Sequence, residues 1–382
     1  MKIKTITCHD VYNYGASLQA YALQTYLQNK GHEVEIIDYL PYYRPDRLNW
    51  FNYKRTKGKI HRIANILPFI KPFIALYDHL NTLEKISYIR FFNKKKIFDD
   101  FKKNMLKCTG KSFHNLDELT KYVFDAELFI AGSDQIWNSV GPNGKDPTFY
   151  CAFAPKGMKC ISYAASFGTS YIPDNQKEFV SQHLKRFSAI SVREASGVDI
   201  VKSLGFYSFE VMDPVFLLDA IEWRRLCRKR HNEKYMLVYD LTMNHPGIKK
   251  MSQYLSRKNG WKIYSINDFK ICPYADYNIN NAGPIDFLEW IKDAQYVICS
   301  SFHGTAFSIL FQKQFYTFPL FEQKNFSRMK DFLHKLGLDD HFIMEEKNFK
   351  DFDEINYLNV NPRLNKLIND SKSWLDSQIV KN

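Results

Sequence analysis

The sequence lacks the features that mark secreted, membrane-spanning or zinc-ribbon proteins. Its seven cysteines are an odd number and include no C-x-x-C pair, which argues against a disulfide framework and against a zinc ribbon. No apolar run approaches the roughly 20 residues that span a bilayer. The chain passes directly from Met1 into a predicted strand, Lys2–Thr7, without the apolar core of a signal peptide. We therefore expect a cytoplasmic protein with buried thiols.

Three further absences narrow the chemistry. The G-x-G-x-x-G fingerprint of dinucleotide binding is missing, because the first strand-to-helix loop has only Gly15. No H-x-x-x-H pair and no His/Asp cluster at ligand spacing is visible, so we expect no metal, no cofactor and activity that survives EDTA. No repeat of 20–50 residues and no low-complexity tract points to a solenoid or a disordered chain.

The charge is unevenly distributed. The 382 residues, 45% hydrophobic and 25% charged, are ordinary for a soluble globular protein and suffice for two domains. Residues 51–111 hold 15 Lys and Arg against 4 Asp and Glu, so this segment carries most of the net charge of +12. Such a block could dock on an anionic membrane surface at the inner leaflet or bind nucleic acid, or it could be a solvated helical face. No nucleic-acid motif accompanies it, so we expect no nucleic-acid partner.

Alternating strand and helix patterns predict an α/β fold with two domains, residues 1–205 and 206–382. A basic helical insertion of about 42–111 interrupts the first domain. The last helix, 371–379, is expected to pack back on that domain. The predicted strands are Lys2–Thr7, Glu33–Asp38, Leu128–Ala131, Cys160–Ala164, Ala189–Val192, Tyr235–Leu241, Trp261–Ile266, Tyr296–Cys299 and Phe315–Phe318. The predicted helices are Ser17–Lys30, Ile86–Leu106, Pro246–Lys258, Pro284–Asp293 and Phe326–Leu336.

Polar side chains follow three successive strands of the first domain. Asp134, Ser166 and Arg193 each come soon after a predicted strand. Because the carboxyl ends of parallel strands meet at one edge of a sheet, we expect these side chains to lie close together. Arg193 is the group expected to hold a carboxylate or a phosphate through two N–H bonds. Taken singly, each residue could equally be a helix cap or part of a surface salt bridge.

The stretch Cys299 to Phe307 is predicted to be a strand end, a tight polar turn and the start of a helix. Such a turn places free N–H groups and the positive end of a helix beside a ligand. Gly304 lets the backbone come close, and His303 can bind an anion or transfer a proton near neutral pH. His303 could instead simply cap the helix. Two domains with strand-end loops of this kind also predict a cleft between them, with His303 on one side and Arg193 on the other.

Five motifs together resemble the polysaccharide pyruvyl transferase family along nearly the whole chain. They are Tyr12-Asn13-Tyr14-Gly15-Ala16-Ser17-Leu18-Gln19-Ala20-Tyr21-Ala22-Leu23, Gly132-Ser133-Asp134-Gln135-Ile136-Trp137, Tyr163-Ala164-Ala165-Ser166-Phe167-Gly168, Ser191-Val192-Arg193-Glu194 and Ser300-Ser301-Phe302-His303-Gly304-Thr305-Ala306. The resemblance implies a glycosyltransferase-B-like fold of two Rossmann-like domains. It also implies an enzyme that transfers pyruvate from phosphoenolpyruvate, its co-substrate, to two hydroxyls of a sugar, forming a cyclic ketal in envelope, capsular or exopolysaccharide biosynthesis.

The same resemblance suggests roles for individual residues. Arg193 and His303 match positions that hold phosphoenolpyruvate, and His303 would also protonate either the leaving phosphate or the methylene carbon. Asp134 is the candidate base. The remaining residues expected to bind substrate are Asn13, Tyr14, Gly15, Ser133, Ser166, Glu194, Ser301, Gly304, Thr305 and Arg328.

One departure from the family pattern concerns the residues before His303. Better-known members have an Arg-Leu pair there, whereas this chain has Ser301-Phe302, so one cation is missing. A basic residue of the insertion or Arg328 would have to replace it, or the donor differs. The alternatives are a glycosyltransferase that uses a nucleotide sugar, or a non-catalytic binding protein of a polysaccharide cluster. The acceptor could be a lipid-linked oligosaccharide, which a basic peripheral surface at 51–111 would suit.

Overall fold

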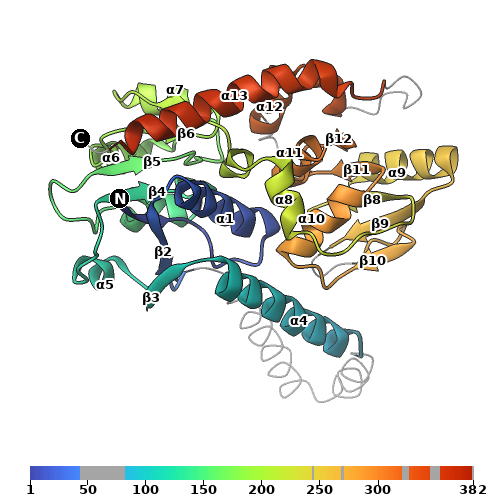
Figure 1. Ribbon diagram of the computed structural model, residues 1–382, viewed down its shortest axis with the longest axis horizontal. Helices are drawn as coiled ribbons and strands as arrows, with labels where there is room; N and C mark the ends of the chain where they lie inside the picture. The colour runs from blue at the N-terminus through green and yellow to red at the C-terminus, as the bar shows by residue number, and fades with distance from the viewer. Residues whose placement is uncertain (44–81, 243–244, 268–270, 321–326, 345–352, 381–382) are drawn as a thin grey trace, which may run out of the picture.

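Two lobes, each built on a parallel β-sheet, form the protein in the computed structural model (Figure 1). The structure describes residues 1–43, 82–242, 245–267, 271–320, 327–344 and 353–380. Apolar runs such as Leu128–Ala131 form the central strands, and all four of those residues are buried. A strand buried on both faces is what a parallel sheet covered by helices requires.

The first sheet has the order β3-β2-β1-β4-β5. Isolated bridges from Ile161 to Ala189 and from Ala165 to Val192 join it to the short parallel pair β6 and β7. Because β7 pairs with β6, this sheet extends past the boundary predicted at residue 205. The strands are β1 (Lys2–Ile6), β2 (Glu33–Tyr39), β3 (Cys108–Phe113), β4 (Leu128–Ala131), β5 (Cys160–Ser162), β6 (Ser191–Val192) and β7 (Phe209–Glu210).

The second sheet repeats this arrangement with the order β10-β9-β8-β11-β12, again all parallel. In both sheets, successive strands are first added on one side of the first strand and then on its other side. The point where the order reverses lies between β1 and β4 in the first sheet and between β8 and β11 in the second. Ligands of open α/β sheets bind at these reversal points, beyond the carboxyl ends of the strands. The strands are β8 (Tyr235–Tyr239), β9 (Lys262–Ile266), β10 (Tyr277–Ile279), β11 (Tyr296–Cys299) and β12 (Gln314–Thr317).

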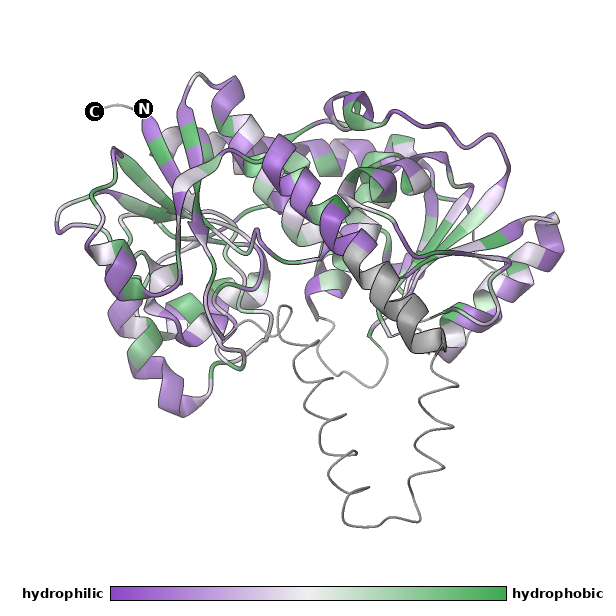
Figure 2. Cartoon of the chain, turned by 90° about the horizontal axis from the view of Figure 1, so that it is seen from below, coloured by the Kyte–Doolittle hydropathy of each residue, from purple (hydrophilic) through white to green (hydrophobic). Residues whose placement is uncertain are grey.

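Helices cover the sheets and connect the lobes (Figures 1 and 2). Rings of α1 and α10 stack on each other, with the centres of Tyr14 and Phe287 4.7 Å apart, so the two lobes share one apolar core. The α-helices are α1 (Tyr14–Asn29), α4 (Thr82–Met105), α5 (Leu116–Thr120), α6 (Asp174–Leu184), α7 (Ala195–Ser203), α8 (Ala220–Leu226), α9 (Pro246–Asn259), α10 (Pro284–Asp293), α11 (Phe302–Leu310), α12 (Ser327–Leu336) and α13 (Tyr357–Gln378). The 3-10 helices are η3 (Asn143–Lys145), η4 (Pro147–Tyr150), η5 (Pro214–Leu217) and η6 (Asp339–His341).

The fold class predicted from the sequence is confirmed, but the basic segment differs from its prediction. Residues 44–81 lie outside the described residues. The remainder forms α4 and then β3, which pairs with β2, so residues 108–111 are strand rather than helix. The segment 42–111 thus connects two neighbouring strands of the sheet. The side chains of α4 also approach the second lobe, where a Cβ on Gly283 would lie 2.2 Å from Ile97.

The C-terminal helix α13 is much longer than predicted and returns to the first lobe. Its Asp376 accepts a hydrogen bond from Tyr26 of α1 at 2.8 Å and pairs with Lys30 at 2.6 Å. Its Ser371 Oγ accepts a hydrogen bond from the Met212 amide at 2.9 Å, in the segment that joins the lobes. Among the described residues, no helix is both long enough and apolar enough to cross a membrane.

Candidate active site

His303 projects from the start of α11 at the reversal point of the second sheet. Ser301, the residue immediately before α11, caps the helix: its Oγ accepts a hydrogen bond from the Gly304 amide at 3.3 Å. The His303 side chain is only 12% exposed, and its Nε2 lies 3.5 Å from Asp213 Oδ2. Its other ring nitrogen faces Gly15 of α1, where an added Cβ would lie 1.9 Å from Nδ1. The imidazole is therefore held between the two lobes.

Asp213, in the segment that joins the lobes, is the acidic centre of the site, and the sequence analysis did not identify it. Its side chain is fully buried and accepts a hydrogen bond from Arg193 Nη1 at 2.5 Å. Ser133 Oγ lies 3.3 Å from the same oxygen, while the other oxygen caps η5 through the Val215 amide at 3.1 Å. Burial by itself would raise the pKa of Asp213, but the charges of His303 and Arg193 outweigh it and hold that pKa below its usual range.

Replacing Asp213 by asparagine is expected to lower stability by about 3–5 kcal/mol at pH 7, because one buried cation then loses its counter-charge. The pKa of Asp213 is depressed in the folded state, so its contribution is complete above the unfolded value near 4 and is lost as the pH falls. The gap between wild type and Asp213→Asn in urea unfolding should therefore shrink in acid.

The exposed Asp174, which pairs with Lys177, provides the control for this experiment. Asp174→Asn should leave the stability close to that of wild type, because solvent screens an exposed ion pair. An Asp213→Asn protein as stable as wild type at pH 7 would show that Asp213 does not neutralise the site.

Arg193 and Ser166 lie together at the edge of the first sheet, as predicted, and Glu194 organises the loop between them. The Glu194 carboxylate accepts hydrogen bonds from Ser166 Oγ at 2.9 Å and from the Phe167 amide at 2.8 Å. Both hydrogen bonds go to Oε1, while Oε2 is buried without a hydrogen bond among the described residues and lies 3.9 Å from Arg193 Nε. Burial would lower the pKa of Arg193, but Asp213 and Glu194 raise it overall. Arg193 is thus a permanent buried cation.

A second guanidinium, that of Arg328 on α12, reaches the same place from the second lobe. It donates a hydrogen bond to Ser166 Oγ at 3.3 Å. Burial, followed by the nearby charge of Arg193, lowers the pKa of Arg328 to about 10. Arg193, Arg328 and Lys335 line one pocket of about 110 Å³ together with Phe302 and five carboxylates, those of Glu194, Glu210, Asp213, Asp331 and Asp370. The two guanidiniums carry paired N–H donors of the kind that bind carboxylates and phosphates.

Asp134 lies beside these cations with an unusual backbone. Its φ of 71° is in the left-handed region, which an aspartate tolerates better than most residues. The carbonyl of Asp134 accepts the Ser166 amide at 3.0 Å, which fixes the two loops against each other. Within the described part of the chain, the half-buried carboxylate forms no hydrogen bond or ion pair.

Several predicted substrate-binding residues have structural roles. The Tyr14 ring is buried between the lobes, and the Asn13 side chain caps α1 by accepting the Ala16 amide at 3.0 Å. Thr305 is fully buried and bonds the Ser301 carbonyl at 3.0 Å and Thr317 at 2.7 Å. Gly304 packs against the Cys299 side chain. These four residues shape the loops around the site.

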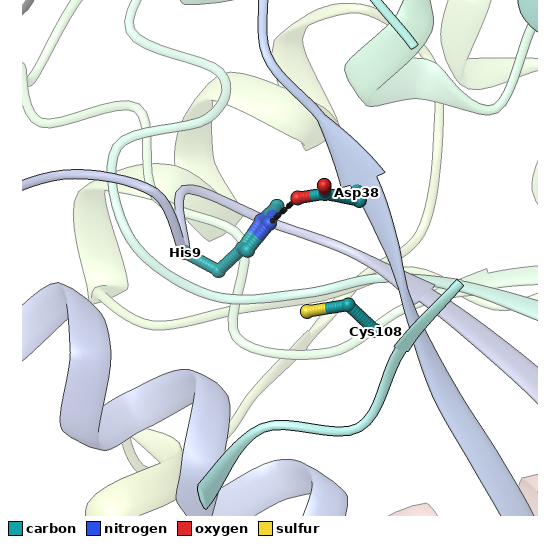
Figure 3. Close-up of side chains that lie close together, drawn as sticks. All are labelled: His9, Asp38 and Cys108. Carbon is teal, nitrogen blue, oxygen red and sulfur yellow. Dashed lines mark hydrogen bonds and ion pairs between the residues drawn. The ribbon is translucent and has the colours of Figure 1, made fainter. Parts of the chain in front are cut away.

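A separate cluster of metal-ligand type lies at the ends of β1, β2 and β3 (Figure 3). His9 Nε2 is 2.9 Å from Asp38 Oδ1, and the ligand atoms of His9, Asp38 and Cys108 lie within 4.8 Å of one another. However, Lys102 of α4 already bonds the same Asp38 oxygen at 2.6 Å, and burial raises the pKa of the Cys108 thiol to about 12. With an ammonium in the cation position and a neutral thiol, the cluster is an ion-paired network that fixes α4 to the sheet.

Replacing Lys102 by methionine should lower stability by about 3 kcal/mol, because Asp38 keeps its burial and loses a cation. His9, Lys102 and Ser112 together hold the pKa of Asp38 below its usual range, against the effect of burial. The loss should therefore be largest above pH 5 and fade in acid. Urea unfolding measures it, with the exposed Lys103→Met as the control. Equal losses in the two variants would contradict a specific role for Lys102.

The two parallel sheets form a two-lobed α/β fold, with the candidate site between their strand ends. The chain belongs to the polysaccharide pyruvyl transferase family, which matches residues 13–319 and so includes every site residue except Arg328.

Solved structures with a similar overall arrangement are only distantly related in sequence. S. aureus MnaA in complex with UDP is 11% identical, covers 97% of this chain and 89% of its own, and has a TM-score of 0.48. The Neisseria meningitidis UDP-GlcNAc 2-epimerase bound to UDP-GlcNAc is 9% identical, covers 99% of both chains and has a TM-score of 0.49. No curated protein matches the chain.

Proposed function

We propose that the protein transfers the pyruvyl group of phosphoenolpyruvate to two hydroxyls of one sugar residue, forming a cyclic ketal. The observation that supports this most strongly is that Arg193 and Arg328 lie together on the Phe302 ring, while Arg193 and His303 both approach Asp213. Phosphoenolpyruvate is a small anion with a carboxylate and a phosphate, and two guanidiniums supply the paired N–H donors that these groups need. Family membership supports the pyruvyl transfer and the sugar acceptor.

The reaction requires one proton donor, one base and cations that stabilise the leaving phosphate. Protonation of the donor methylene carbon makes C2 electrophilic, and the first sugar hydroxyl attacks it and loses its proton. The second hydroxyl then closes the ring as the C2–O bond to phosphate breaks, and its proton goes to the departing phosphate, which leaves in its monoprotonated form. In this scheme His303 donates the proton to the methylene carbon, Asp134 accepts the proton of the first hydroxyl, and the two arginines hold the charge of the phosphate.

In this proposal, Arg328 replaces the cation that the family pattern has before His303 and that this chain lacks at Ser301. Ser301 carries no charge and is occupied in capping α11. Arg328 comes from a different helix, yet it bonds Ser166 in the loop beside Arg193. It therefore supplies the second cation that the donor requires.

The test is a titration of the purified protein with phosphoenolpyruvate, followed by a transfer assay. Calorimetry should show saturable binding that His303→Ala retains only weakly, and phosphorus NMR should show phosphate release that depends on the acceptor sugar. If a nucleotide sugar binds and phosphoenolpyruvate does not, the protein is a glycosyltransferase and the proposal is wrong.

The acceptor proposed here is an oligosaccharide carried on a lipid, reached from the inner face of the cytoplasmic membrane. The basic segment 51–111 motivates this proposal, although its residues up to 81 lie outside the described part. Of the described lysines in α4, Lys94 is buried and Lys102 is ion-paired, so neither belongs to a free basic surface. Flotation with anionic and neutral vesicles tests the membrane contact, and equal absence from both vesicle fractions would refute it.

A further inference from the structure

A second pocket, of about 460 Å³, lies outside the candidate active site, beside β10 and α10 of the second lobe (Figure 1). Its lining includes three side-chain amides, one indole and one ion pair, namely those of Asn278, Asn280, Asn281, Trp290, Lys229 and Asp286. Pockets for small ligands have volumes of roughly 300–1,000 Å³ and are lined mainly by apolar side chains. The volume is therefore usual, but a lining rich in amides points to a polar ligand.

Two polar groups of this lining have no hydrogen-bond partner among the described residues. Asn280 Oδ1 is buried without a donor, and the indole N–H of Trp290 donates to no described residue. Asn278 differs, because its Oδ1 accepts the Cys272 amide at 2.7 Å and its Nδ2 donates to the Cys272 carbonyl at 3.1 Å. A buried acceptor without a donor is unfavourable, and a hydroxyl of a ligand would supply the donor that Asn280 lacks.

The charges of the lining cancel. Lys229 Nζ and Asp286 Oδ1 pair at 2.7 Å, and Asp286 Oδ2 accepts the Gly283 amide at 2.9 Å. Glu289 also faces Lys229, but its carboxylate is buried and accepts the amides of Arg228 and Lys229, each at 2.7 Å. Among the described residues that line the pocket, no charge is unpaired, so an uncharged ligand is favoured.

The apolar part of the pocket is rigid. The Trp290 ring stacks on His231, with ring centres 3.5 Å apart, and packs against Tyr264 at 5.4 Å. Ile279 and Ala282 add aliphatic surface. An amide offers an acceptor and two donors, which matches neighbouring hydroxyls that each donate and accept hydrogen bonds. A polar, uncharged lining with a fixed apolar wall therefore suits a sugar ring, which carries hydroxyls at its edge and C–H groups on its faces.

The pocket lies at the same edge of the second sheet as His303. Asn280 directly follows β10, the turn into α11 directly follows β11, and the strands of this sheet are all parallel. The order β10-β9-β8-β11 places three strand spacings between the two strand ends, about 14 Å in all. A short oligosaccharide spans such a distance, so one glycan can reach both places.

We propose that this pocket binds an uncharged sugar residue of the acceptor glycan, different from the residue that receives the pyruvyl group. Asn280 and the indole N–H of Trp290 hydrogen-bond its hydroxyls, and the pocket thereby contributes to the choice of acceptor. The identification of the glycan as the acceptor rests on the proposed function, whereas the binding of a sugar does not.

The first experiment titrates the full chain with methyl glycosides of the common hexoses, 6-deoxyhexoses and N-acetylhexosamines, followed by saturation-transfer NMR. At least one glycoside should bind saturably. Asn280→Leu should weaken that binding about tenfold, because the hydrogen bonds of one amide to the sugar are lost. The matched control is Asn365→Leu, an exposed position of α13 outside the pocket, which should bind as wild type does.

Thermal unfolding without sugar separates a binding role of Asn280 from a structural one. Asn280→Leu should unfold at the same temperature as wild type or at a higher one, because an apolar side chain replaces an acceptor that is buried and unpaired. A clear loss of stability together with a loss of binding would show that Asn280 maintains the fold, and would overturn the inference.

A transfer assay with phosphoenolpyruvate and an oligosaccharide acceptor separates the inference from the proposed function. Asn280→Leu should raise the KM of the acceptor and leave binding of phosphoenolpyruvate unchanged. Sugar binding that depends on Asn280, without any pyruvyl transfer, would refute the proposed function and keep the pocket. Pyruvyl transfer with an unchanged acceptor KM would do the reverse. The inference is also overturned if no glycoside binds, if wild type and Asn280→Leu bind equally, or if UDP displaces the sugar.

Discussion

Arg193→Ala is expected to abolish saturable binding of phosphoenolpyruvate and to reduce pyruvyl transfer by at least about 100-fold, since charge-assisted hydrogen bonds contribute about 1.5–3 kcal/mol each. The loss has two origins. The donor loses its permanent cation, and Asp213 is left buried with a weaker counter-charge, at 3.5 Å from His303. The second effect should also lower stability by about 3–5 kcal/mol.

Two further variants distinguish loss of the anchor from general unfolding. Arg193→Lys keeps the charge and loses the fork, so it should be stable and bind weakly. Arg186→Ala removes another half-buried arginine, one that bonds the Pro155 carbonyl at 2.6 Å away from the site, and should leave donor binding unchanged. Calorimetry and urea unfolding measure the two quantities separately. Normal donor binding by a folded Arg193→Ala protein would remove Arg193 from the site.

Gly15→Ala is expected to reduce activity by about 100-fold or more while the protein stays folded. An alanine Cβ would lie 1.9 Å from His303 Nδ1, so the imidazole must move by more than an ångström, and displacements of that size can cost about 100-fold in rate. Stability should not fall in parallel, because alanine in a helix is favoured over glycine by about 1 kcal/mol. Steady-state kinetics and thermal unfolding test the two parts.

The control is Gly110→Ala in β3, where an added Cβ meets no atom within 4 Å. The double variant Gly15→Ala/His303→Ala adds a second check. If His303 is the group that the added methyl displaces, the double variant should be no less active than His303→Ala alone. Full activity in Gly15→Ala would show that His303 does not act from the position seen here.

Much of this architecture could be predicted because most of its elements carry a local signal. Buried strands such as β4 are continuous apolar runs, and the turn into α11 contains a helix cap and a glycine. The strand β3 was missed because its residues, Cys-Thr-Gly-Lys-Ser-Phe, are largely polar; it lies at the edge of the sheet, where only Phe113 is buried. Much of α13 was missed because it is polar and has Pro362 inside it.

The site was harder to predict than the fold. Arg193, Ser166 and Asp134 follow strands, so their proximity follows from the parallel sheet. Asp213 follows the two-residue strand β7 and faces Arg193 and His303 only because two lobes meet there. Nothing in its neighbours Met212 and Pro214 signals that contact. Gly15 was expected to approach a substrate, whereas in the structure it provides room for a side chain from the other lobe.

The path of α13 determines where the chain can be divided into fragments. The helix follows the second sheet in the chain, yet it bonds Tyr26 and Lys30 of the first lobe through Asp376. A fragment that ends after β7 would expose the surface of the first lobe that α13 covers, including the ring of Tyr163, which lies 6.4 Å from that of Trp374. The first lobe therefore needs α13 to cover its surface. Chimeras that exchange a lobe between relatives should transfer α13 together with the first lobe.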